Sequence, residues 1–67
     1  MKITLKAARI NAGYTQTEAA SQIGVTRDTV GNWERGKSFP DAAQIRKLEQ
    51  LYGTSYDEII FLPHVTL

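Results

Sequence analysis

The chain has 67 residues, no cysteine and a formal net charge of +1, which corresponds to one small domain. The lack of cysteine excludes disulfides and thiolate metal ligands and fits a reducing cytoplasm. No apolar run approaches the roughly 20 residues of a membrane span, and no signal peptide is visible after Met1. We therefore expect one cytoplasmic domain over residues 1–67 with no membrane partner.

Charge is unevenly distributed between the two parts of the chain. Residues 1–40 carry six lysines and arginines against three acidic residues, a balance of +3, whereas residues 41–67 carry two against four, a balance of −2. An anionic partner is therefore expected on the first part of the chain.

Capping residues and glycines alternate along the chain in a pattern typical of short helices. Thr4 can cap a first helix, Thr15 opens the capping box TQTE, and Thr26 caps a third helix. Asp41 opens a fourth helix, and Ser55 begins a second capping box, SYDE. Four glycines follow helical stretches and can end them in a left-handed conformation: Gly13, Gly24, Gly36 and Gly53. The predicted helices span about 5–12, 16–23, 27–35, 42–52 and 56–61.

Apolar residues recur at helical spacing and predict a single core. The inward positions are Leu5, Ala8, Ala19, Ala20, Ile23, Val30, Trp33, Ile45, Leu48, Tyr52, Ile59 and Ile60. Outside the helices, the terminal segments KIT (2–4) and HVTL (64–67) alternate polar and apolar residues. This alternation predicts a small two-stranded ribbon between the ends of an otherwise all-α domain.

The second and third predicted helices are joined only by Gly24, Val25 and Thr26. A link this short forces the two helices to cross steeply, which is the geometry of a helix-turn-helix over about residues 16–35. Ala20 is small where the helices must approach each other. A generic corner between two helices of a bundle is the alternative interpretation.

Residues 14–40, YTQTEAASQIGVTRDTVGNWERGKSFP, resemble the XRE family, the Cro/C1-type helix-turn-helix of phage repressors and bacterial regulators. The resemblance extends over residues 5 to about 61. It implies a compact five-helix, lambda-repressor-like domain, usually dimeric, with its third helix in the major groove of DNA. The sequence departs from the family pattern at Gly31 and Thr54, and the tail 62–67 lies outside it.

The resemblance implies that base edges are read by residues of the third helix. Val30 and Trp33 are turned inward, so the other side of this helix faces outward. On that side an arginine can donate two hydrogen bonds to guanine, an asparagine can pair with adenine, and an aspartate can accept from the cytosine amino group. By family position the readers are Thr26, Arg27, Asp28 and Asn32. A solvated helix face is the alternative, and Asp28 also suits the positive end of the helix dipole.

Phosphate contacts are expected beside these readers. Gln16 begins the second helix, whose free amides suit a phosphate, and the family position agrees. Arg35, Lys37 and Ser38 at the end of the third helix can hold the same strand. Gly31 costs helix stability, and we interpret it as a site where the backbone approaches the DNA closely, or as a position that needs no side chain.

Two further sets of residues are indicated by family position and composition. Arg9 and Glu34 occupy positions that form an ion pair in the family, although two unrelated surface charges are the alternative. Candidate dimer contacts, which could instead belong to the core of one chain, are Phe39, Tyr56, Ile60, Phe61 and Leu62.

Other functional classes have little support in the sequence. The single histidine, His64, has no cysteine or carboxylate cluster beside it, so we expect no enzyme, metal site, cofactor or small-molecule ligand. A protein-binding module of the antitoxin type that keeps the helix-turn-helix is the main alternative, because the net charge is modest. The favoured function is a stand-alone repressor that binds a palindromic operator in double-stranded DNA as a homodimer, inside a bacterium or a phage-infected host.

Overall fold

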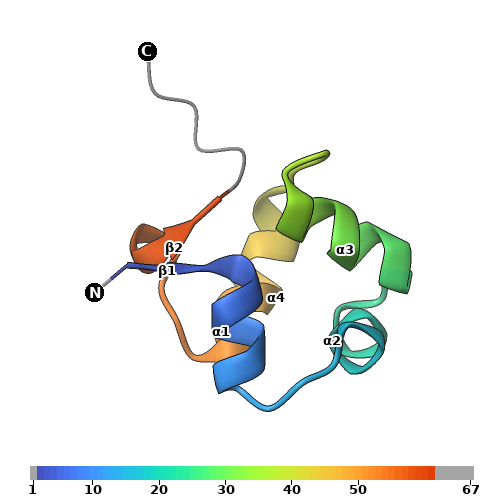
Figure 1. The fold of residues 1–67 in the computed structure, drawn as a ribbon, viewed down its shortest axis with the longest axis horizontal. Helices are drawn as coiled ribbons and strands as arrows, with labels where there is room; N and C mark the ends of the chain where they lie inside the picture. The colour runs from blue at the N-terminus through green and yellow to red at the C-terminus, as the bar shows by residue number, and fades with distance from the viewer. Residues whose placement is uncertain (1, 62–67) are drawn as a thin grey trace.

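The computed structural model describes residues 2–61. Four α-helices are present in this part of the chain: α1 (Leu5–Asn11), α2 (Gln16–Ile23), α3 (Arg27–Arg35) and α4 (Ala42–Tyr52). Figure 1 shows α2 and α3 together at one end of the molecule and a pair of short strands at the opposite end. The mostly helical class and the helix-turn-helix are confirmed.

Each helix begins where a side chain accepts a hydrogen bond from its first turn. The Thr4 side chain accepts from the Ala7 N–H, and Thr15 and Asp41 each begin a complete capping box. These contacts satisfy amide groups that a helix start leaves without intrahelical partners. The four helix boundaries expected from the sequence are therefore met to within one residue.

The fifth predicted helix is wrong. Residues Tyr56–Glu58 form a single 3₁₀ turn, and Ile59–Ile60 then extend as strand β2. Ser55 does engage Glu58, through its backbone N–H at 3.4 Å and its hydroxyl at 3.1 Å. The two isoleucines are β-branched and favour extended backbone, so the chain leaves the turn as a strand instead of continuing as a helix.

Strand β2 pairs in parallel with β1 (Ile3–Thr4), with Ile3 opposite Ile59 and Thr4 opposite Ile60. A pairing of the first residues was expected, but the partner differs from the sequence prediction, and residues 64–67 lie outside the described part of the chain. The pairing places β2 against α1, with Ile59 buried in the core.

One core lies between the four helices and β2. Ten hydrophobic residues are buried in it: Leu5, Ala8, Ala19, Ala20, Ile23, Val30, Trp33, Leu48, Tyr52 and Ile59. All ten were expected from the sequence. Ile45 and Ile60, also expected there, are only half-buried, so they lie at the edge of the core.

Candidate nucleic-acid interface

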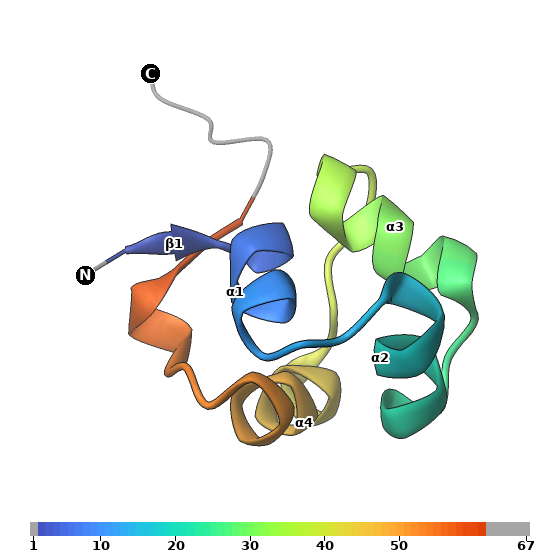
Figure 2. The ribbon, with the colours of Figure 1, turned by 60° about the horizontal axis from the view of Figure 1, so that its bottom comes forward.

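The turn between α2 and α3 sets the angle at which α3 is presented. Gly24 has a φ of 89°, a left-handed conformation that ends α2, and its N–H donates to the Ala20 carbonyl. The Val25 N–H donates to the same carbonyl at 3.0 Å. Figure 2 shows the short connection leading from α2 directly into α3. The two helices are thus fixed to each other as a helix-turn-helix.

Helix α3 has one buried and one open side. Val30 is completely buried and Trp33 is 2% exposed, so these residues anchor the helix to the core. Arg27 and Asp28 are exposed on the other side, and no described residue forms a hydrogen bond or ion pair with either side chain. Within residues 2–61, the first turn of α3 therefore presents a cation and a carboxylate that have no partner.

Thr26 caps α3 at the same end. Its hydroxyl accepts from the Thr29 N–H at 3.2 Å and shares a 2.9 Å hydrogen bond with the Thr29 hydroxyl. The Thr26 hydroxyl is thus engaged within the protein, although the residue is exposed. Thr29, which no sequence pattern indicated, fixes this hydroxyl.

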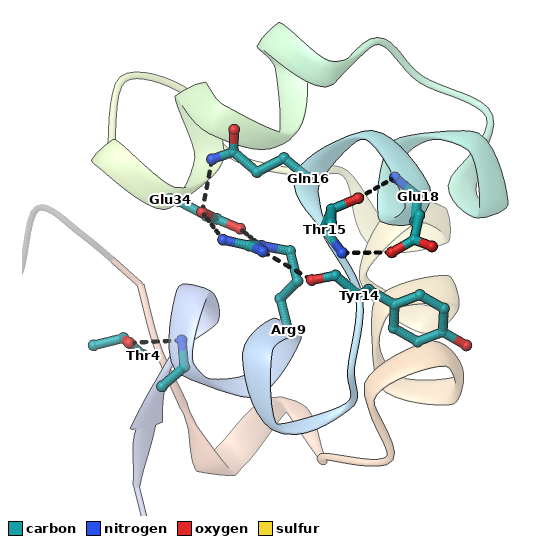
Figure 3. Close-up of polar contacts among 8 residues, drawn as sticks. Thr4, Arg9, Tyr14, Thr15, Gln16, Glu18 and Glu34 are labelled. Carbon is teal, nitrogen blue, oxygen red and sulfur yellow. Dashed lines mark hydrogen bonds and ion pairs between the residues drawn. The ribbon is translucent and has the colours of Figure 1, made fainter.

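An ion pair joins α1 to α3 beneath the open side of α3. Arg9 Nε donates to Glu34 Oε2 at 2.6 Å and Arg9 Nη2 donates to Glu34 Oε1 at 3.2 Å. The two side chains are only 9% and 4% exposed. Arg9 also donates to the Tyr14 carbonyl at 2.8 Å, so it ties the loop before α2 to the same point (Figure 3).

Gln16 at the start of α2 completes this cluster. Its side-chain Nε2 donates to Glu34 Oε1 at 3.0 Å (Figure 3). The Gln16 side chain is therefore used inside the protein rather than extended toward solvent. Thr15 and Glu18 satisfy each other's backbone N–H groups, which leaves the backbone N–H groups of Gln16 and Thr17 as the free donors of the first turn within the described residues.

These contacts and burial raise the pKa values of Arg9 and Tyr52. The pKa of Arg9 is raised above its usual value, mainly by its hydrogen bonds to Glu34, against the opposing effect of burial. The pKa of Tyr52 is raised to about 12, first by burial and then by the negative charge of Glu34. Arg9 therefore stays protonated and Tyr52 stays neutral at neutral pH.

The end of α3 carries the remaining candidates. Arg35 is exposed, and its Nη2 donates to Asn32 Oδ1 at 2.8 Å. Lys37 and Ser38 lie in the next loop and are exposed. Gly36 ends the helix with a φ of 77°. The structure thus gathers the candidate base-reading and phosphate-binding residues along α3, the start of α2 and one adjoining loop.

The candidate dimer residues lie in a separate group. Phe39, 62% exposed, has its ring 5.7 Å from that of Phe61, and Tyr56, 51% exposed, has its ring 5.5 Å from Phe61. Ile60 is half-buried and, with Lys2, Ile59 and Phe61, lines a surface pocket. Leu62, the fifth candidate, lies outside the described residues.

Residues 2–61 contain neither a candidate metal site nor a candidate membrane-spanning helix. This part of the chain contains no group of three or more histidine, cysteine, aspartate or glutamate side chains that could hold a metal ion. Nor does it contain a helix long and apolar enough to span a membrane.

Residues 5–59 match the helix-turn-helix family. The chain belongs to this family, in its XRE (Cro/C1) type. It is 41% identical over 56 residues to the HTH-type transcriptional regulator ImmR of Bacillus subtilis, covering 84% of this chain and 44% of ImmR. The match to the SPbeta prophage-derived HTH-type transcriptional regulator YonR of Bacillus subtilis is 38% over 56 residues, covering 84% and 52%.

The chain thus spans about half the length of these two relatives. An HTH-type transcriptional regulator of Methanothermobacter thermautotrophicus is 31% identical over 62 residues, and the aligned part covers 92% of this chain and 90% of that protein. No solved structure gives a significant match. The family resemblance expected from residues 14–40 is confirmed.

Sequence reasoning missed how two of these side chains are used. The Gln16 side-chain amide contacts Glu34, and the Arg35 guanidinium lies against Asn32. The expected phosphate contacts of both residues stay predictions. The spacing of three residues between Asn32 and Arg35, which brings side chains together on a helix, was the available signal for the second contact.

Proposed function

We propose that this chain is a sequence-specific transcriptional regulator that binds double-stranded DNA with α3 in the major groove. One observation carries the proposal: α3 is held rigidly from below by Trp33 and Glu34 while its outer side carries Arg27, Asp28, Asn32 and Arg35. Helices of this kind read base edges in helix-turn-helix proteins. The names of the relatives, all regulators, support the same function.

The bases are read by Thr26, Arg27, Asp28 and Asn32. Arg27, which is exposed and has no partner among residues 2–61, is the main reader, because a guanidinium can donate twice to guanine O6 and N7. Gln16 contributes its backbone N–H rather than its side chain to a phosphate, and Lys37 and Ser38 hold the same backbone. The regulator acts as a repressor and is located in the cytoplasm.

A homodimer on a palindromic operator is the binding unit. One recognition helix reads only a few base pairs, so two-fold symmetry supplies the rest of the specificity. The exposed rings of Phe39 and Tyr56, packed against Phe61, provide an apolar surface for a second copy. Ile60 extends this surface, and Leu62 stays a predicted dimer contact from the sequence.

Selection of bound sequences from random duplex DNA tests the proposal. Enrichment of a palindrome, with affinity that falls steeply between low and moderate salt, supports it, because salt competes with every phosphate contact. Absence of any enriched sequence, together with binding that salt leaves unchanged, would instead favour the protein-binding module.

A further inference from the structure

We propose that Gly31, Asn32 and Arg35 act as one unit that selects guanine, in which Arg35 positions Asn32 and Gly31 leaves room for Arg35. This inference rests on the proposed DNA-binding function and assigns the base that Asn32 reads. The central observation is the 2.8 Å hydrogen bond from Arg35 Nη2 to Asn32 Oδ1 on the outer side of α3.

The direction of this hydrogen bond decides what Asn32 can offer a base. A guanidinium donates hydrogen bonds and accepts none, so Asn32 must present its carbonyl oxygen to Arg35. The Asn32 amide nitrogen, with two N–H groups, then faces away from Arg35. The Asn32 oxygen keeps a second lone pair, but the hydrogen bond turns it toward Arg35, so we expect the pair to offer a base mainly N–H donors.

Guanine matches this donor pattern. In the major groove guanine exposes two acceptors, O6 and N7, whereas adenine exposes one acceptor and one amino donor. Free asparagine fits adenine because its oxygen accepts from that amino group. With the oxygen held by Arg35, the pair fits guanine instead.

Gly31 leaves the space that the Arg35 guanidinium occupies. Side chains on a helix lean toward its N-terminus, so Arg35 reaches back over the residue four positions earlier. A Cβ atom at Gly31 would lie 3.3 Å from Arg35 Nη1 and 3.7 Å from its Nη2. Contact at 3.3 Å is tight, and the guanidinium, at the end of a flexible side chain, would have to shift.

The same Cβ would lie 3.7 Å from Gln16 Nε2, an ordinary contact distance. Alanine at position 31 would therefore leave the Gln16–Glu34 hydrogen bond in place and disturb Arg35 first. The helix itself favours alanine over glycine in its interior. The glycine is thus unfavourable for α3, and the arrangement of Arg35 and Asn32 gives a reason for it.

The test compares base preferences of the wild-type protein and of three variants by selection from random duplexes. Asn32→Ala first identifies the base pair that Asn32 reads, as the position at which preference disappears. The wild type should show guanine there. Arg35→Ala should lower the guanine-to-adenine ratio at that position about tenfold, because freed asparagine pairs with adenine. Gly31→Ala should lower the same ratio by less, because it only displaces the guanidinium.

Two controls separate positioning from charge and from folding. Arg35→Lys keeps the charge, so it should retain affinity for random DNA while weakening the guanine preference. Lys37→Ala should lower affinity for all sequences and leave the preference intact. Gly31→Ala should unfold at the same or a higher temperature than the wild type, which excludes a loss of fold.

Adenine at the Asn32 position in the wild type would overturn the inference, as would an unchanged guanine preference in Arg35→Ala. Equal loss of affinity for all sequences in Gly31→Ala, with the preference intact, would show that the glycine serves close approach to DNA instead. These results leave the proposed function standing. If the wild type enriches no sequence, the proposed function and this inference both fail.

Discussion

Arg9 and Glu34 lie 25 positions apart in the chain and share two hydrogen bonds, at 2.6 and 3.2 Å, where α1, α3 and the start of α2 meet. Because both side chains are almost fully buried, the opposite charge of each offsets the free-energy cost of burying the other. Removing one member leaves the other buried and uncompensated.

A double-mutant cycle tests this dependence. Arg9→Met and Glu34→Leu should each lower the free energy of unfolding by about 3 kcal/mol, whereas the double variant should lose much less than the sum, since an apolar pair can replace a buried ion pair. Urea denaturation followed by Trp33 fluorescence measures all four proteins. Additive losses would show that the two side chains do not depend on each other.

The capping box at the start of α2 gives a second prediction. Thr15→Ala should cost about 1 kcal/mol of stability, because the Glu18 N–H loses the hydroxyl that accepts from it at 3.1 Å. Thr17→Ala, at an exposed position two residues later, is the matched control and should change stability little. Thermal unfolding by circular dichroism compares them. Equal effects of the two substitutions would contradict a capping role.

Tyr52 provides a test by pH. Its hydroxyl is buried and makes no hydrogen bond within residues 2–61, and burial raises its pKa from 10 to about 12. The unfolded chain therefore loses this proton first, so stability should be intact below pH 10 and fall as the pH rises toward 12. Tyr52→Phe should remove this part of the decline.

Ultraviolet titration of tyrosine ionisation checks the assignment. The late step near pH 12 should vanish in Tyr52→Phe and persist in Tyr56→Phe, the control with an exposed ring. Stability at neutral pH should stay the same or rise by up to about 1 kcal/mol in Tyr52→Phe, since an unpartnered hydroxyl is removed. A loss above that amount would reveal a hydrogen bond to this hydroxyl.

Substitution of a base-reading residue and of a phosphate-binding residue should differ in how the loss of affinity depends on the DNA sequence. Arg27→Ala should cost roughly 1–3 kcal/mol on the selected operator and little on random DNA. Lys37→Ala should weaken both and lower the salt dependence by about one unit. Fluorescence titrations of both variants, compared at matched salt and repeated at several salt concentrations, measure these effects. Equal losses on both DNAs for Arg27→Ala would remove it from the readers.

The exposed rings give the fifth prediction. Phe39→Ser and Tyr56→Ser should shift the protein toward monomer and weaken binding to the full palindrome more than to a single half-site, because only the palindrome uses both copies. Sedimentation at tens of micromolar protein measures the oligomeric state, and Thr17→Ser is the surface control. A wild-type monomer that binds the palindrome as one copy would contradict the dimer.

Local signals in the sequence were enough to predict α1 to α4. Thr15 with Glu18 and Asp41 with Gln44 mark helix starts through contacts only three residues apart, and such contacts depend on nothing distant. The same signal at Ser55 led to a wrong helix, because the backbone after Glu58 is held extended by pairing with Ile3, 56 positions before Ile59. A capping motif predicts where a helix starts and not how far it continues.

In the candidate site, too, features set by local sequence could be predicted and features set by distant contacts could not. Burial of Val30 and Trp33 is predictable from helical spacing, so the outer side of α3 could be predicted. The partner of Gln16 could not, because its contact with Glu34 depends on the angle between α2 and α3 and on the place where Arg9 enters from α1. Contacts between distant side chains require the packed structure.

The parallel pairing of Ile3 with Ile59 bears on the order of assembly. It closes a loop of 56 residues, and closing so long a flexible loop costs roughly 3–4 kcal/mol in chain entropy. Packing of the helices must first bring the ends together. The strand pair is therefore expected to form last during folding and to open first in the native protein, while α2 and α3 stay in place.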